Sequence, residues 1–226
     1  MRGKLIVIEA GDGCGKATQA KALVERLCAD GLPARRVSFP DYESDSSALV
    51  KMYLNGEFGR DVQSVNAYAA SLFYAVDRFA SYRRRWREWY EQGEIIVADR
   101  YTTSNMVHQA VKIGDAAKRK AYLDWLWDLE FVKLELPVPD AVFFLDLPPS
   151  FSAQLLAARA QGKHEGADLH EADAAYLARC YEAYCELAQL YGWRRIDCVD
   201  AAGLKSVERI HEAIYRGVRA VCAENA

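Results

Sequence analysis

The segment from Glu9 to Gln19 has the composition of a phosphate-binding loop. It reads EAGDGCGKATQ, with three glycines in five residues, and it directly follows a short apolar run. Glycines let the backbone turn its N–H groups inward around an anion, and the start of a following helix adds partial positive charge. Lys16 would add a full charge, so the loop is expected to bind nucleotide phosphates. The expected contacts are Gly11, Asp12, Gly13, Cys14, Gly15, Lys16, Ala17 and Thr18.

Two alanines depart from the usual form of this loop, G-x-x-x-x-G-K-[ST]. Ala10 replaces the first glycine, and Ala17 replaces the hydroxyl residue that ligates Mg²⁺ in that pattern. Thr18 lies about 100° further round the helix, which makes it a poor substitute. Phosphate oxygens, waters and nearby carboxylates are therefore expected to hold the metal. Cys14 has two interpretations: a thiol of lowered pKa at a helix N-terminus, or a small filler of the loop.

Charged and aromatic residues follow two further apolar runs. Asp99 and Arg100 come directly after Ile95–Ala98, where an open parallel sheet binds its ligands. Asp99 is placed to orient Mg²⁺ through water and Arg100 to bridge phosphates, although a purely structural ion pair is the alternative. After the run 36–39, the hydroxyl of Tyr42 could reach a phosphate, and Asp41 could act as a base toward a hydroxyl substrate.

Tyr74 and Arg78 are four residues apart in a segment of helical periodicity, so they share one helix face. An aromatic ring beside a guanidinium suits a nucleobase, through stacking and hydrogen bonds to a carbonyl. Ordinary packing of an aromatic beside an arginine is the alternative.

Strands and helices are expected to alternate along the chain, and they must position the loop, the charged residues and the aromatic residues described above. Buried strands are expected at Leu5–Ile8, Arg36–Phe39, Ile95–Ala98, Val142–Leu145 and Arg195–Val199. Helices are expected at 17–29, 46–55, 64–90, 103–113, 116–132, 150–160, 171–190 and 204–222. This alternation predicts an α/β fold with a mostly parallel sheet covered on both faces. Since no repeat or linker interrupts it, residues 1–226 are expected to form one domain.

Residues 161–170 are polar and contain two glycines, which is typical of a plain loop or of a lid over a site.

Composition narrows the class of function. The chain has 226 residues, 51% hydrophobic and 27% charged, and a net charge of −3. This balance argues against broad binding to nucleic acids or membrane surfaces. No apolar run is long enough for a transmembrane helix, and the N-terminal run is too short for a signal peptide. The six cysteines form no C-x-x-C pair, so reduced thiols in the cytoplasm are expected.

The ordered landmarks of the whole chain resemble the thymidylate kinase family of nucleoside monophosphate kinases. They are Glu9…Asp12-Gly13…Gly15-Lys16…Thr18-Gln19, Phe39-Pro40, Tyr74…Asp77-Arg78, Asp99-Arg100-Tyr101…Ser104-Asn105…Gln109 and Leu145-Asp146…Pro149. The resemblance implies a three-layer P-loop kinase fold with a five-stranded parallel sheet, a lid at about 160–170 and usually a homodimer. It also implies ATP- and Mg²⁺-dependent phosphorylation of dTMP to dTDP.

The resemblance also assigns roles to residues. Lys16 and the glycine loop would hold the ATP phosphates, with Asp99 and Glu9 reaching Mg²⁺ through water. The implied dTMP contacts are Asp12, Phe39, Pro40, Tyr42, Tyr74, Arg78, Arg100, Asn105, His108 and Gln109. The candidates for phosphoryl transfer are Lys16, Asp99, Arg100, Arg159 and Lys163, the last two as cations of the lid. His108 stands where the family often has a tyrosine that excludes a ribose 2′-hydroxyl.

Three other functions remain open. A deoxynucleoside kinase would use Asp41 as its base. His108 raises the possibility of a kinase for UMP, dUMP or another pyrimidine monophosphate. Ala10 and Ala17 raise that of a degenerate protein that binds nucleotides without turnover.

Overall fold

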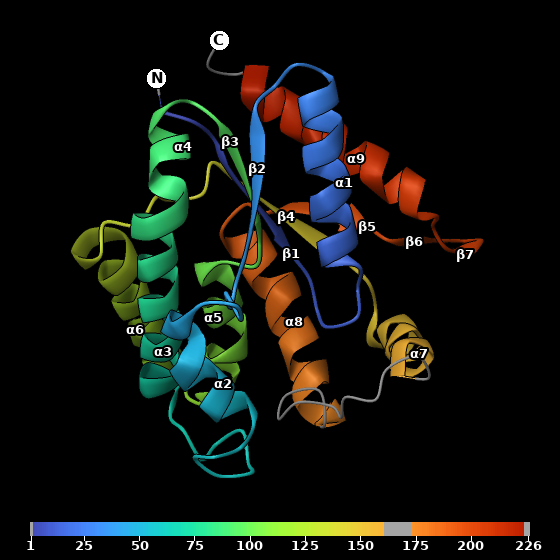
Figure 1. Cartoon of the computed structure of the whole chain (residues 1–226). Helices are drawn as coiled ribbons and strands as arrows, with labels where there is room; N and C mark the ends of the chain where they lie inside the picture. The colour runs from blue at the N-terminus through green and yellow to red at the C-terminus, as the bar shows by residue number, and fades with distance from the viewer. Residues whose placement is uncertain (1, 161–172, 224–226) are drawn as a thin grey trace.

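A five-stranded parallel sheet forms the middle layer of the molecule (Figure 1). The computed structural model describes residues 2–160 and 173–223, without the side chains of 156–160. The strands of this sheet are β1 (Leu5–Glu9), β2 (Ala34–Ser38), β3 (Ile95–Asp99), β4 (Ala141–Asp146) and β5 (Arg194–Asp197). Within the described ranges they lie in the order β2-β3-β1-β4-β5, all parallel. The expected α/β fold is therefore confirmed.

Helices cover both faces of the sheet, as the alternation of the strands requires. Side chains of successive strand residues point to opposite faces. Leu5 and Val7 belong to one core cluster, whereas Ile6 and Ile8 belong to the other. The first cluster packs against α4 (Arg87–Glu91), α5 (Thr102–His108), α6 (Ala116–Trp127) and α8 (Ala174–Leu190). The second packs against α1 (Lys16–Ala29), α7 (Pro149–Ala160) and α9 (Val207–Ala223).

The segment expected as one helix over 64–90 is divided in the structure. It consists of α3 (Ala67–Ser81), the π-helical turn η2 (Tyr82–Trp86) and α4. Before it, the helix expected over 46–55 is present as the short 3-10 turn η1 (Asp45–Ser47) followed by α2 (Ala48–Leu54). Asn66 begins α3, because its side chain accepts a hydrogen bond from the N–H of Ala69 at 2.9 Å. The wider turn η2 seats Trp86, which is fully buried, against Tyr82 and Tyr90.

Two other segments differ from their expected boundaries. The helix expected over 116–132 ends in a π-helical turn, η4 (Asp128–Lys133), and α5 is followed by a short 3-10 turn, η3 (Ala110–Lys112). The fifth strand ends at Asp197 instead of Val199. Val199, expected in that strand, and Leu204, expected in the next helix, belong instead to the hairpin of β6 (Val199–Asp200) and β7 (Gly203–Leu204). Asp200 fixes this turn by accepting a hydrogen bond from the N–H of Ala202.

The carboxyl ends of the central strands meet at one edge of the sheet. Asp99 pairs in register with Ile8 on β1 and with Ser38 on β2. Glu9 pairs with Phe144 on β4. The loops after β1, β2 and β3 therefore leave the sheet side by side, which is where ligands bind in this architecture. The expected lid at 160–170, with Lys163 and the side chain of Arg159, lies outside the described residues.

Candidate active site

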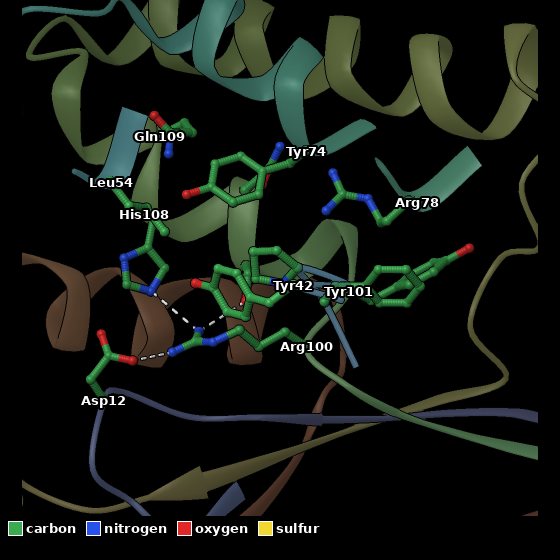
Figure 2. Close-up of a pocket in the computed structure, with 13 residues that line it drawn as sticks. Asp12, Tyr42, Leu54, Tyr74, Arg78, Arg100, Tyr101, His108 and Gln109 are labelled. Atoms are coloured by element: carbon green, nitrogen blue, oxygen red, sulfur yellow. Dashed lines mark hydrogen bonds and ion pairs between the residues drawn. The ribbon is translucent and has the colours of Figure 1, made fainter. Parts of the chain in front are cut away.

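A cleft opens at this edge of the sheet, with ≈ 550 Å³ of empty space when the part open to solvent is included (Figure 2). All ten residues expected to contact dTMP line it: Asp12, Phe39, Pro40, Tyr42, Tyr74, Arg78, Arg100, Asn105, His108 and Gln109. Leu54, Tyr101 and Ser104 complete the lining, although the sequence did not single them out as contacts. The cleft therefore joins the loops after β1, β2 and β3 to helices α2, α3 and α5.

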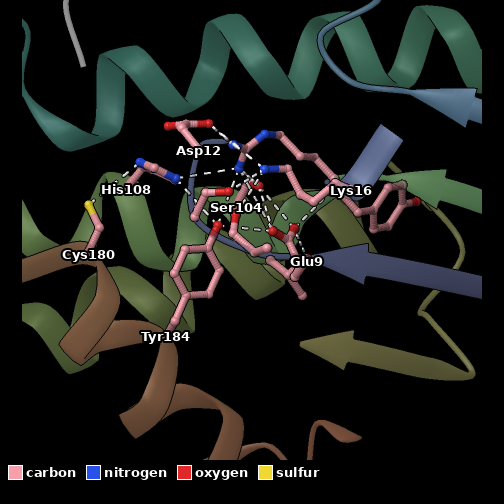
Figure 3. A network of polar contacts seen from close by, with 12 residues as sticks. Glu9, Asp12, Lys16, Ser104, His108, Cys180 and Tyr184 are labelled. Carbon is pink, nitrogen blue, oxygen red and sulfur yellow. Dashed lines mark hydrogen bonds and ion pairs between the residues drawn. The ribbon is translucent and has the colours of Figure 1, made fainter. Parts of the chain in front are cut away.

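The glycine loop wraps around the amine of Lys16 (Figure 3). Gly13 and Gly15 have φ angles of 75° and 79°, in the left-handed region that favours glycine. The Nζ of Lys16 donates to the carbonyls of Ala10 at 3.2 Å and Gly11 at 2.6 Å. Burial lowers the pKa of Lys16, and the nearby guanidinium of Arg100 lowers it further. The loop thus concentrates a lysine and the N-terminus of α1 at one point.

Arg100 is the central cation of the cleft. Its Nη2 pairs with the carboxylate of Asp12, and its Nη1 donates to the hydroxyl of Ser104 at 3.0 Å and that of Tyr184 at 3.3 Å. Burial disfavours the charged form of Arg100, but the combined attraction of Asp12, Tyr184, Glu9 and Asp99 outweighs burial, and the pKa of Arg100 is raised. Its φ angle of 68° is unusual for a residue with a side chain, and such strain concentrates at functional sites.

Glu9 organises the floor beneath Arg100 and is fully buried. Its Oε1 accepts hydrogen bonds from the hydroxyls of Thr103 at 2.6 Å and Ser104 at 3.0 Å. The Oε1 also accepts from the N–H of Tyr101 at 3.3 Å, and the Oε2 from the hydroxyls of Ser104 and Tyr184, both at 3.0 Å. Both carboxylate oxygens are thus occupied by protein donors, which fixes the start of α5 against β1.

Helix α8 lies against His108 with three buried residues that the sequence analysis did not select. The hydroxyl of Tyr176 donates to the carbonyl of His108 at 2.7 Å, and the thiol of Cys180 lies 3.6 Å from its Nδ1. Tyr184 follows one turn later and reaches the Nε2 at 3.4 Å. Because these three residues are spaced four apart, the sequence indicates that they share one helix face. The spacing does not indicate that this face contacts His108.

The far end of the cleft is built for a planar polar group. Tyr74 and Arg78 lie there one turn apart on α3, as their spacing predicted (Figure 2). Arg78 is 1% exposed and forms a bidentate ion pair with Glu130, at 2.7 Å from Nε to Oε2 and 2.5 Å from Nη2 to Oε1. Both amide atoms of Gln109 are buried without a partner in the described part of the chain. Glu130 is a residue that the sequence analysis missed.

Asp41 and Cys14 do not show the chemistry that the sequence analysis considered for them. The carboxylate of Asp41 lies 2.6 Å from Arg85 and borders two neighbouring surface pockets, not the main cleft. Burial raises the pKa of the Cys14 thiol despite the attraction of Lys16, which favours the second of its two interpretations, a small filler of the loop. Cys14 instead packs in the core as a small filler.

Comparison with known proteins agrees with this geometry. The family model described as thymidylate kinase matches residues 8–214. The chain belongs to the thymidylate kinase family. As a member it is a nucleoside monophosphate kinase, a transferase. The thymidylate kinase of Synechococcus sp. (strain RCC307) is 31% identical over 224 residues, covering 97% of both chains. The human thymidylate kinase is 30% identical over 213 residues, covering 94% of this chain and 88% of its own.

A solved structure supports the family's fold. The chain superposes on the thymidylate kinase from Candida albicans with a TM-score of 0.68 at 22% identity, covering 97% of this chain and 92% of the other. That identity supports a likeness of fold alone. Over residues 2–160 and 173–223, no helix has the length and apolarity that crossing a bilayer requires.

Lys112 should make stability depend on pH, because its side chain is partly buried between Tyr53 and Val65. Its Nζ donates to the hydroxyl of Tyr53 at 2.8 Å and to the carbonyl of Val65 at 3.0 Å. Burial lowers its pKa from 10.5 to about 8. Between these values the unfolded chain holds one more proton, so stability rises with pH in that window. A pKa shift of this size corresponds to about 3 kcal/mol, and solvent reaching the partly exposed side chain reduces it, so below pH 8 the charge costs about 2–3 kcal/mol.

Lys112→Met removes this cost, so its stability relative to wild type should be highest near neutral pH. The advantage should shrink by about 2–3 kcal/mol as the pH rises through the window from 8 to 10.5. Urea unfolding at a series of pH values measures it, with the exposed Lys118→Met as the control. A difference that stays constant with pH would show that Lys112 titrates normally.

Proposed function

We propose that this chain transfers the γ-phosphoryl group of ATP to dTMP, giving dTDP for dTTP synthesis. One observation carries the proposal: a single cleft joins the phosphate loop, through Asp12 and Arg100, to Tyr74, Arg78 and Gln109. The end at Arg100 suits a phosphate. The end at Tyr74, Arg78 and Gln109 suits a pyrimidine base that offers a carbonyl and a ring N–H. A nucleotide whose base lies at this second end would place its phosphate toward the loop.

The acceptor needs no general base in this mechanism. The second pKa of a phosphate monoester is about 6, so the attacking oxygen is already ionised near neutral pH. The protein must instead align two anions and reduce their repulsion. Arg100 would hold the acceptor phosphate, while Lys16 and the N-terminus of α1 hold the donor. Glu9 and Ser104 keep Arg100 in place, and Asp12 balances its charge in the free enzyme.

Mg²⁺ would fit this site through a small number of protein ligands. No cluster of three His, Cys, Asp or Glu residues that could hold a metal occurs in the part of the chain that the structure describes. Mg²⁺ is typically held by one or two carboxylates together with phosphates and water. Asp12 and Asp99 offer carboxylates at the loop, while the oxygens of Glu9 are occupied, so we assign Glu9 to orienting Arg100. When bound, the metal would neutralise charge on the transferring group.

The alternative of a deoxynucleoside kinase has less support. Its hydroxyl nucleophile needs a carboxylate base in the cleft. Asp41 is paired with Arg85, its backbone N–H is bound by Asp77, and it lies outside the cleft lining.

A panel of acceptors with ATP and Mg²⁺ tests the proposed function. Initial rates of ADP release should be highest with dTMP, lower with dUMP, and absent with thymidine. The ratio of dUMP to UMP measures what His108 does beside the sugar. Faster turnover of thymidine than of dTMP would favour the deoxynucleoside kinase, and no turnover with any acceptor would favour a degenerate binding protein.

We also propose that the protein is a homodimer joined through α3. The face of α3 turned away from the cleft exposes Leu72 (43%), Val76 (53%) and Phe79 (38%). A second copy would bury this stripe by self-complementary packing. Sedimentation should therefore show a dimer for the wild type and a monomer for Val76→Arg. Leu190→Arg, at a 66% exposed site on α8, should stay dimeric. A wild-type monomer would exclude the proposal.

A cytoplasmic location completes the proposed function. All six cysteines are free. Five of them are at least partly buried, and burial raises the pKa of each: Cys14, Cys180, Cys185, Cys198 and Cys222. Free thiols suit a reducing compartment.

A further inference from the structure

Glu130 is a buried carboxylate that the sequence analysis did not single out. It lies in the π-helical turn η4, 52 residues after Arg78, and it is fully buried. Its Oε2 accepts from the Nε of Arg78 at 2.7 Å and from the hydroxyl of Thr102 at 2.6 Å. Its Oε1 accepts from the Nη2 of Arg78 at 2.5 Å. Removing a charge from a buried pair is costly, so the pair is a fixed part of the core.

This pairing uses only one edge of the Arg78 guanidinium. A guanidinium carries five N–H donors in a rigid plane and no acceptor. Glu130 takes the Nε and Nη2 edge, whereas Nη1 has no hydrogen-bond partner within the described ranges. Arg78 lines the cleft, and Figure 2 shows its guanidinium facing the same space as Tyr74. The edge left to the cleft can therefore donate but cannot accept.

We propose that Glu130 is a positioning residue that sets base specificity by clamping Arg78 with its Nη1 edge toward the cleft. A base seated there must offer a carbonyl oxygen, as thymine and uracil do at the ring position where cytosine carries an amino group. A bidentate carboxylate fixes both the position and the plane of the guanidinium. It also supplies the counter-charge that lets a cation face a neutral base in a buried setting. The proposal rests on the proposed function, because it takes the base end of the cleft as given.

The charge state of the pair supports this arrangement. Burial by itself would lower the pKa of Arg78, but the carboxylate of Glu130 outweighs it, and the pKa of Arg78 is raised. Arg78 therefore stays a donor at every pH at which the protein is folded. A guanidinium can only donate, so it disfavours a base that presents an amino group. A neutral amide side chain can donate or accept, so it would tolerate either a carbonyl or an amino group on the base.

Glu130→Gln tests the clamp, because it keeps the shape and removes the charge. The KM for dTMP should rise by about tenfold or more, while the KM for ATP stays at the wild-type value. Glu212→Gln is the matched control: it makes the same exchange in another Arg–Glu pair, with Arg26 at 2.6 Å on the opposite face of the sheet. It should change neither KM. Equal increases in both KM values, or no increase, in a folded Glu130→Gln protein would overturn the proposal.

A double variant keeps the test decisive if Glu130→Gln does not fold. Arg78→Gln with Glu130→Gln replaces the ion pair by two amides, each able to donate and accept. Calorimetric affinities for dTMP and dCMP should then differ by less than about tenfold, against a larger preference for dTMP in the wild type. A double variant that keeps the wild-type preference would overturn the proposal. A wild type that binds neither nucleotide would instead contradict the proposed function.

Discussion

Replacing Arg100 with methionine should lower kcat/KM for dTMP by about a thousandfold. Arg100 contacts Asp12 of the phosphate loop, Ser104 of α5 and Tyr184 of α8 at once. Its charge would be needed most when the acceptor phosphate meets the transferring phosphoryl group, so kcat should fall as well as affinity. Steady-state kinetics with dTMP varied at saturating ATP measures the effect.

Arg35→Met is the control for this variant. Arg35 lies on β2, half exposed, and pairs with Glu94 away from the cleft. Wild-type kinetics are expected for it. If Arg100→Met kept more than about a tenth of the wild-type kcat/KM, Arg100 would not be the residue that holds the acceptor phosphate.

Lys16→Met should lower kcat by about a hundredfold and leave the KM for dTMP nearly unchanged. The amine of Lys16 lies at the centre of the loop, held by the carbonyls of Ala10 and Gly11. Methionine fills a similar volume and places no charge in this buried position, so the thermal midpoint should not fall. A loss of turnover without a loss of stability would assign the charge to catalysis.

Lys21→Met provides the comparison on the same helix, since Lys21 is 70% exposed and pairs with Glu25 one turn away. Its kcat should equal that of the wild type. Normal turnover in folded Lys16→Met would remove the glycine loop from the mechanism, whatever the cleft binds.

The parts of the fold that local patterns encode were predictable from the sequence. The apolar runs gave all five strands of the sheet to within about two residues at most ends. The phosphate loop followed from its three glycines and Lys16 between an apolar run and a helix. The site at the carboxyl ends of β2 and β3 followed from the alternation of strands and helices. The ten residues that the family resemblance assigned to dTMP all line one cleft, a grouping that periodicity could not have given, and their contact with dTMP stays a prediction.

The unpredicted parts depend on contacts between distant segments. Glu130 and Arg78 are separated by 52 residues, and nothing near Glu130 marks it as the partner of an arginine. The hydroxyl of Tyr184 reaches Glu9 across 175 residues. Helical periodicity also ran through residues 64–90 without showing η2, because the wider turn is set by where Trp86 packs.

Simultaneous binding of two nucleotides tests the central claim most directly. Calorimetric titration of dTMP should be made into protein saturated with Mg²⁺ and a non-hydrolysable ATP analogue. A cleft that aligns donor and acceptor phosphates predicts one dTMP per chain, with an affinity at least equal to that without the analogue. Mutual exclusion of the two nucleotides, or no dTMP binding at all, would contradict it.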